Sequence, residues 1–216
     1  MNLSRQHIKD LILVPALITL AVTVLRLAGE LLEWSPFLFS RKAGGGGSPI
    51  GIAWLVPVFG VYFAWKLAKS GHASVGAGRA VGFALLGLAV LFVSSVIVMM
   101  LASQPTEPWA IVVMSLISLV AAYVVTRGWK ELTSTLLIYG LAARIPVIIV
   151  MFFAILGNWG THYDVAPNPE FPAMGWFSKW LAIGLFPQLT MWVAFTIIVG
   201  GLVGGITLAV VGRDSD

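Results

Sequence analysis

Residues 11–34 read LILVPALITLAVTVLRLAGELLEW, and this stretch decides the fold class. Most residues in this stretch of 24 are aliphatic. A helix needs about 20 mostly apolar residues to cross the hydrocarbon core of a bilayer. We therefore predict that this segment crosses a membrane as a helix.

A row of polar residues interrupts the run at spacings of four, three, four and three: Thr19, Thr23, Arg26, Glu30 and Glu33. Residues spaced in this way lie on one face of a helix. Ionisable groups at membrane depth are costly, and they usually face protein or water rather than lipid. This polar stripe is therefore a first candidate for a functional site.

The composition of the whole chain supports a membrane protein. The 216 residues are 59% hydrophobic and 10% charged, with a mean hydropathy of +0.96, whereas soluble domains carry about 25% charged residues. The net charge of +4 does not indicate nucleic-acid binding, because the basic residues are scattered through the connections. The absence of cysteine excludes disulfides, thiolate metal sites, iron–sulfur clusters and cysteine catalysis.

We predict an all-α integral membrane protein with six transmembrane helices in a single domain, 1–216. The predicted spans are about 11–34, 50–67, 81–102, 109–126, 132–156 and 188–211. The first is predicted to be retained, because it is too long for the apolar region of a signal peptide. Residues 176–211 are too long for one span, so either Pro187 separates an interfacial helix at 174–186 from the last span, or one long tilted helix forms.

The basic residues predict the orientation, because cytoplasmic loops are enriched in lysine and arginine. With the N-terminus inside, eight of them fall on the cytoplasmic side: Arg5, Lys9, Lys66, Lys69, Arg79, Arg127, Lys130 and Arg213. Three fall outside: Arg41, Lys42 and Lys179. We therefore expect both termini in the cytoplasm, in a plasma membrane or a bacterial inner membrane.

Two connections are long, and both are predicted to lie outside. Residues 35–49 include Gly44–Ser48, which matches a common engineered linker and equally a natural glycine-rich loop, and we expect no chemistry from it. Residues 158–175 carry His162, Tyr163 and Asp164 among several prolines. We interpret this second connection as a lid over a polar cavity, as a docking surface, or as a solvated loop without a specific role.

Within the stripe, Arg26 and Glu30 are four residues apart and can form an ion pair on one helix face. A rise of about 1.5 Å per residue places Arg26 in the outer half of the membrane, with Glu30 and Glu33 near the outer interface. In one interpretation the two glutamates reach water and Arg26 simply pairs with Glu30. In the other, the stripe lines a polar cavity that is open to the outside.

Arg144 lies near the middle of the fifth predicted span, two residues before Pro146. An arginine at that depth stays charged and needs an anion or several carbonyl groups. Proline leaves the carbonyl group of Ala142 without its usual hydrogen bond. Glu30 is the expected partner of Arg144, either in a structural clamp between the first and fifth spans or in a binding site.

The sequence predicts neither a cofactor nor a metal site. A zinc site needs three or four ligands, but the chain holds only three histidines, and two of them are predicted on the other side from His162. The glycine pairs of the last span, Gly200/Gly204 and Gly201/Gly205, predict close helix packing within the chain rather than dimerisation.

The first functional hypothesis is a small transporter or channel-like protein for an anionic or zwitterionic ligand. Its ligand-binding residues would be Arg26, Glu30, Glu33, Arg144, His162, Tyr163 and Asp164. The alternative is a non-catalytic scaffold or accessory subunit of a membrane complex. The third hypothesis, a membrane-embedded lipid-modifying enzyme, is disfavoured because the sequence shows no nucleophile–base set. The expected partners are the lipid bilayer and either further copies of the chain or another membrane protein.

Overall fold

The computed structural model describes residues 5–44, 48–102, 107–167, 169, 171 and 173–212, and within these residues every regular element is helical. The first five helices are α1 (Arg5–Leu31), α2 (Leu55–Lys69), α3 (Ala77–Leu101), α4 (Pro108–Thr126) and α5 (Lys130–Gly157). The last helix contains α6 (Trp176–Lys179), the π-helical turns η2 (Trp180–Leu185) and η3 (Gln188–Trp192), and α7 (Val193–Val211).

The predicted all-helical membrane fold is confirmed. Within the described part of the chain, five helices are long and apolar enough to cross a membrane. The remaining long helix, α2, has 15 residues and is about 22 Å long, so it is shorter than the hydrocarbon core of a bilayer. The helix begins later than the predicted span of about 50–67, because residues 50–54 form bends and turns ahead of it.

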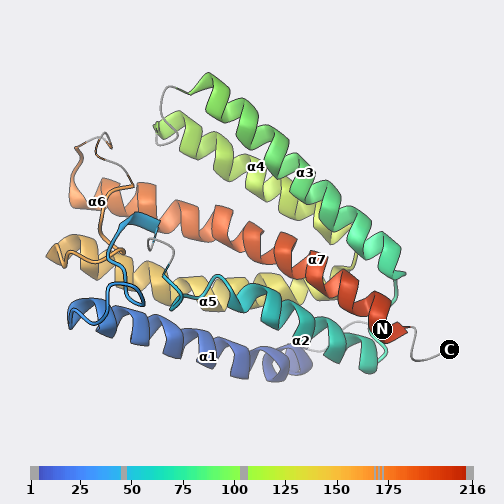
Figure 1. Ribbon diagram of the computed structural model, residues 1–216. Helices are drawn as coiled ribbons and strands as arrows, with labels where there is room; N and C mark the ends of the chain where they lie inside the picture. The colour runs from blue at the N-terminus through green and yellow to red at the C-terminus, as the bar shows by residue number, and fades with distance from the viewer. Residues whose placement is uncertain are drawn as a thin grey trace.

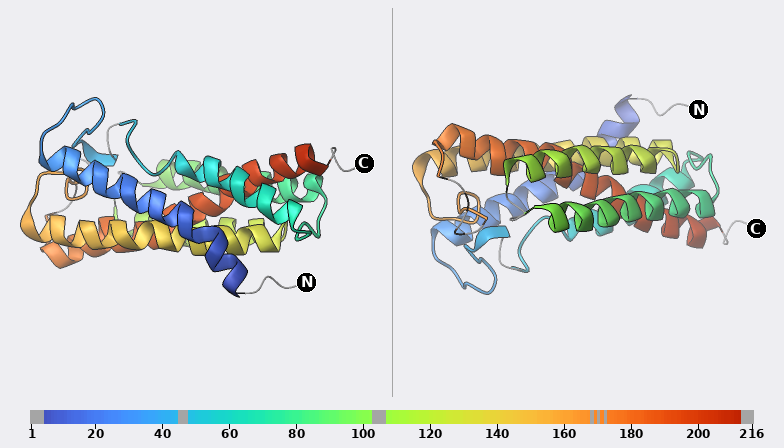
Figure 2. Two further views of the ribbon diagram at one scale, coloured as in Figure 1. Left: turned by 90° about the horizontal axis from the view of Figure 1, so that it is seen from below. Right: turned by 90° about the horizontal axis from the view of Figure 1, so that it is seen from above.

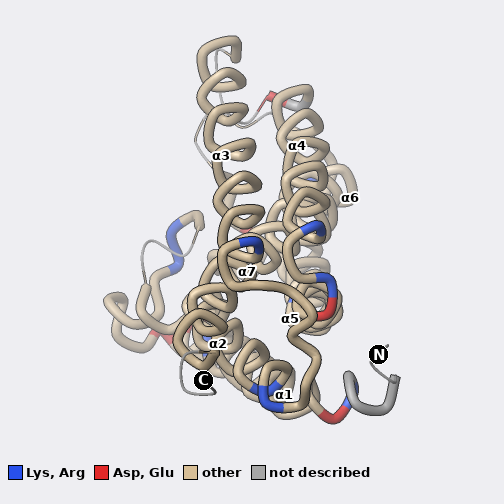
Figure 3. Tube along the Cα trace, turned by 90° about the vertical axis from the view of Figure 1, so that its right-hand side faces the viewer, with Lys and Arg blue, Asp and Glu red and all other residues tan. Residues whose placement is uncertain are grey.

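The last helix occupies the centre of the bundle (Figure 1). α7 packs against α2, α3, α4 and α5, while α1 lies along α5. α3 and α4 form a pair that crosses α7 at an angle, so that their connected ends stand away from α6 (Figures 1 and 3). The central position of α7 explains its composition, since 10 of its 19 residues are buried inside the protein.

Glycines in α7 allow this close packing. A Cβ atom at Gly200 would lie 2.5 Å from the side chain of Leu136 in α5, and one at Gly60 in α2 would lie 2.9 Å from the backbone of Gly200. Gly205 makes a similarly close approach to α3. The prediction that the glycine pairs of the last span pack within the chain is therefore confirmed.

Of the two predicted arrangements for residues 176–211, the structure has the single long helix. The chain stays helical through Pro187, so no separate interfacial helix precedes the last span. The turns on either side of the proline are π-helical. Proline lacks the N–H group for an ordinary helical hydrogen bond, and a widened turn accommodates that loss without ending the helix.

The topology places the start of α1 and the end of α7 at one end of the bundle, which we call the terminal end (Figure 1). The described parts of both long connections, residues 32–54 and 158–175, lie at the opposite end, the loop end (Figure 2). Figure 3 looks onto the terminal end, where lysines lie in the last turn of α2, an arginine lies in the first turn of α3, and Arg127 and Lys130 join α4 to α5. Arg213 lies outside the described residues, and the assignment of the terminal end to the cytoplasm stays a prediction.

Candidate functional site

A cavity of about 640 Å³ opens at the loop end of the bundle, between α1, α5, the π-helical turns and both long connections. We call it the loop-end cavity. The polar and aromatic residues that line it and bear on the argument below are Thr23, Arg26, Arg144, His162, Tyr163, Gln188 and Trp192.

The polar stripe of α1 forms one buried face over most of its length. Thr19, Thr23, Arg26 and Glu30 are all at most 4% exposed. The Thr19 hydroxyl lies 2.8 Å from the Tyr139 hydroxyl of α5, whereas Thr23 and Arg26 line the loop-end cavity. The stripe therefore faces α5 and the connections rather than lipid, as the cost of exposing polar groups to lipid requires.

Glu30 is the centre of a buried ion-pair network and is fully enclosed. Its Oε1 atom accepts hydrogen bonds from Arg26 Nε at 2.5 Å and from His162 Nδ1 at 2.5 Å. Its Oε2 atom accepts a hydrogen bond from the backbone N–H of His162 at 2.8 Å. Because a carboxylate only accepts, the hydrogen-bonded Nδ1 of His162 must carry the proton. The interpretation that Glu30 reaches water is wrong.

The same network holds the first long connection. The guanidinium group of Arg26 donates to the carbonyl oxygens of Ser40, at 2.9 Å, and Ile50. Arg41 donates through Nε to the carbonyl oxygen of Glu30 at 2.8 Å. One end of α1 is thus tied to both long connections, which come from distant parts of the sequence.

The glycine-rich segment is only partly described, because residues 45–47 lie outside the described part of the chain. At its two ends, Gly44 and Ser48 line the loop-end cavity. Ser48 also donates from its hydroxyl to the carbonyl oxygen of Leu38 and accepts from the backbone N–H of Ser40 at 3.2 Å. Ser48 therefore ties the end of this segment to residues 38–40 beside the cavity.

Glu33 lies outside the network, as a position near the interface predicts. It follows the end of α1 with a φ of 54°, and its side chain is 76% exposed. Its carboxylate pairs with Arg41 Nη1 at 3.2 Å. An exposed pair of this kind contributes little to stability, and Glu33 is not among the residues that line the loop-end cavity.

Asp164 organises the second connection rather than facing the cavity. Its carboxylate accepts hydrogen bonds from the backbone N–H groups of Gly160, at 2.9 Å, and Thr161, at 2.7 Å. It also accepts one from the Thr161 hydroxyl at 2.7 Å. These bonds fix the turn that presents His162 to Glu30, so Asp164 positions the site indirectly.

Tyr163 contributes to the cavity wall. Its ring packs against the ring of His162 with centroids 3.9 Å apart, and its hydroxyl donates to the carbonyl oxygen of Thr23 at 3.5 Å. Burial raises the pKa of the Tyr163 phenol above its usual range, because the charged form loses its hydration. The phenol is therefore a neutral donor at physiological pH.

Arg144 does not pair with Glu30, and the prediction of that pair is wrong. The guanidinium group of Arg144 donates through Nη1 to the amide oxygen of Gln188 at 3.3 Å and lies 4.4 Å from the ring centroid of Trp192. Its Nε atom is buried without a hydrogen-bond partner. Among the described residues no carboxylate pairs with Arg144, although the residue is only 4% exposed.

The structure thus separates the predicted site residues into two groups. Arg26, Glu30 and His162 meet in one network, and Arg144 lines the same cavity with partners of its own. Gln188 and Trp192 complete the site and were not predicted. A signal for Gln188 exists in the sequence, since it is the one amide side chain between Trp180 and Val211.

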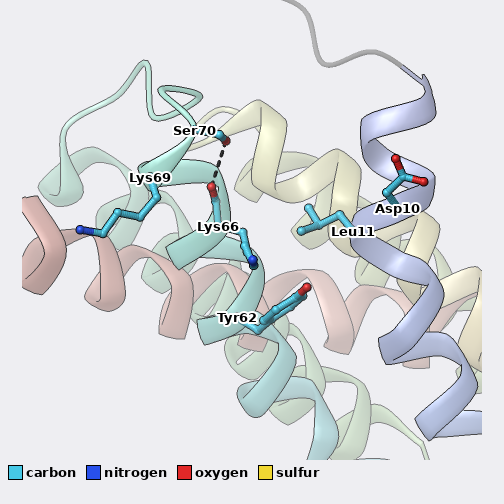
Figure 4. Close-up of a pocket in the computed structure, with 6 residues that line it drawn as sticks. All are labelled: Asp10, Leu11, Tyr62, Lys66, Lys69 and Ser70. Atoms are coloured by element: carbon cyan, nitrogen blue, oxygen red, sulfur yellow. Dashed lines mark hydrogen bonds between the residues drawn. The ribbon is translucent and has the colours of Figure 1, made fainter.

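A smaller cavity of about 350 Å³ lies at the terminal end, between α1 and α2 (Figure 4). Asp10 and Lys66 both line it, and the ammonium group of Lys66 lies 5.2 Å from the ring centroid of Trp65. Neither cavity offers a metal centre, because no cluster of three His, Asp or Glu side chains occurs in the part of the chain that the structure describes. The loop-end cavity is therefore the candidate functional site.

A scan against protein-family models, a search of curated proteins and a search of solved structures all found no match to this chain.

Proposed function

We propose that this polytopic membrane protein is a small transporter that binds an anionic or zwitterionic ligand in the loop-end cavity. The observation that carries the proposal is the state of Arg144. This buried guanidinium group lines the cavity with an amide oxygen and an aromatic face as its described partners. The anionic group of a ligand would supply the missing counter-charge.

The depth of Arg144 makes the argument stronger. The residue lies 14 positions after the start of α5 and 13 before its end, about 20 Å from each at 1.5 Å per residue. Arginine remains charged at such depth, and a charge there normally finds an anion or a water-filled space. A site for a ligand at the middle of the membrane is typical of small-solute carriers.

The helices around the cavity also favour a protein that changes conformation. Gln188 and Trp192 lie in the π-helical turn η3, directly after Pro187, and Pro146 lies two residues after Arg144. π-helical turns and prolines interrupt the regular hydrogen bonding of a helix, and π-helical turns are frequent at functional sites. A carrier needs such a place to bend, whereas a static scaffold does not.

Because the chain contains no cysteine, single-cysteine variants test the proposal directly. We would introduce Gln188→Cys and, separately, Thr23→Cys, and treat proteoliposomes with a maleimide that cannot cross the membrane. Thr23 is a suitable second position because its hydroxyl bonds within its own helix, at the carbonyl oxygen of Thr19. Each side of the membrane is exposed to the reagent in turn.

A carrier predicts that both cysteines react quickly from the loop end and also, more slowly, from the terminal end. Ala84→Cys is the matched control, because Ala84 is fully buried away from the cavity and should react from neither side. Reaction of both cavity cysteines from the loop end alone would refute transport. That result would favour the alternative of a scaffold or accessory subunit with a closed-ended pocket.

A further inference from the structure

We infer that the ligand of the loop-end cavity is an organic acid with a single negative charge and an apolar body. This inference rests on the proposed function only in placing a ligand in that cavity. It follows from three properties of the cavity: the balance of charge around it, the chemistry of its wall, and the position of its unpaired guanidinium group.

The balance of charge indicates one anionic group. Arg26 is already neutralised by Glu30 through the 2.5 Å ion pair, and Nδ1 of His162 is hydrogen-bonded to the same carboxylate. Among the charged side chains described in the structure, this leaves Arg144 as the one cavity cation without a carboxylate. One guanidinium group matches one carboxylate or one singly charged phosphate ester.

The wall around Arg144 is largely apolar. Val147 and Met151 lie one and two turns further along α5, and Ile183 faces the cavity from the last helix. Trp54 and Trp192 add two aromatic side chains. A volume of about 640 Å³ falls in the range of about 300–1,000 Å³ that is usual for small organic ligands. The wall is thus suited to a hydrocarbon or aromatic body beside the anionic group.

This combination disfavours other anions. An inorganic anion would bring charge into the middle of the membrane without apolar contacts, and the second charge of a dicarboxylate would find no free cation among the described residues. The Arg144 guanidinium group lies 4.4 Å from the ring centroid of Trp192, and a planar carboxylate would approach in the plane of that group, where its N–H donors point. A singly charged amphipathic acid satisfies each of these conditions.

The experiment measures binding to the full chain in lipid nanodiscs by isothermal titration calorimetry. The probes are decanoate, its uncharged methyl ester, decanedioate and inorganic phosphate. We expect decanoate to bind most tightly, with the ester, the diacid and phosphate each at least tenfold weaker. These comparisons use the unaltered protein and do not depend on the folding of a variant.

Two substitutions then test the role of Arg144. We expect Arg144→Gln to weaken decanoate binding by about 10- to 150-fold, the loss that corresponds to hydrogen bonds with a charged group, while the methyl ester binds as before. Arg144→Lys keeps the charge and should weaken binding less. Arg79→Gln is the matched control, because Arg79 is an exposed residue at the terminal end that bonds to the carbonyl oxygen of Arg127.

The source of the acid is resolved by comparing a bilayer-soluble and a water-soluble probe. Oleate supplied within the nanodisc and phenylacetate supplied in solution share the chemistry, and binding of either one through Arg144 supports the inference. Binding of the methyl ester as tightly as decanoate, or preferential binding of phosphate, would overturn it. The cysteine accessibility experiment reports on transport alone, so either proposal can fail while the other stands.

Discussion

The replacement Glu30→Gln should strongly destabilise this protein. Glu30 is fully buried and accepts hydrogen bonds from three donors: Arg26 Nε, His162 Nδ1 and the backbone N–H of His162. Glutamine keeps one acceptor oxygen, and its NH₂ group would face one of those donors. Removing one partner of a buried ion pair costs about 3–5 kcal/mol, and we expect a loss of that size in the free energy of unfolding.

The assay is chemical or thermal unfolding of the purified protein in one detergent, followed by helical circular dichroism. Glu33→Gln is the matched control, since it makes the same chemical change three residues later at a carboxylate that is 76% exposed. The pair between Glu33 and Arg41 is exposed, so its loss should change the free energy of unfolding by about 1 kcal/mol at most. The two variants should therefore be well separated.

A double-mutant cycle gives the sharper test. Because Arg26 and Glu30 bond to each other, Arg26→Gln and Glu30→Gln should be non-additive by about 1–3 kcal/mol. Surface substitutions commonly change the free energy of unfolding by up to about 0.5 kcal/mol. If the free energies of unfolding of Glu30→Gln and Glu33→Gln differ by no more than that, then Glu30 is not buried in an ion-pair network. Additive effects of the two replacements would contradict the direct contact.

Three further predictions follow from the packing and the loop-end turn. Gly60→Ala should lower the free energy of unfolding by about 1–3 kcal/mol, because the added Cβ atom would lie 2.9 Å from the backbone of Gly200. Its control is Gly82→Ala, whose Cβ atom would meet no atom within 4 Å, so this variant should be neutral or slightly stabilising in the same assay. Asp164→Ala should free the turn that it caps and raise amide hydrogen exchange there by about 30-fold, for a loss of about 2 kcal/mol. The raised pKa of Tyr163 means that its phenol stays protonated when folded while the unfolded phenol ionises above pH of about 10. The wild type should therefore lose stability as the pH rises above 10, and Tyr163→Phe should lose less, as measured by unfolding between pH 8 and 11.

The sequence predicted the helices well because each one is decided locally. An apolar run of sufficient length has no alternative in a bilayer, where every backbone polar group must find its hydrogen bond within the helix. The boundaries failed where the local signal was ambiguous. The turns at residues 50–54 are apolar and resemble the start of a span, and Pro187 resembles a break although π-helical turns carry the helix through it.

The candidate site was predictable only in part, for a related reason. Arg26 and Glu30 were expected to pair because a spacing of four residues places two side chains side by side on a helix, independently of the rest of the chain. The partner of Arg144 was not predictable. Glu30 was the charge-complementary choice, yet Gln188, 44 residues along the chain, lies within hydrogen-bonding distance instead.

The sequence by itself determined that this is a helical membrane protein with Arg26 and Glu30 one turn apart in α1 and an arginine near the middle of α5. The tertiary structure alone decided that His162, 132 residues from Glu30, joins the hydrogen bonds around that carboxylate, and that Arg144 is left with an amide and a tryptophan ring beside a cavity. The physical reason lies in the membrane itself. Lipid is as apolar as the protein interior, so the apolar pattern of a span does not show which face turns inward, and the rotation of each helix is set by packing.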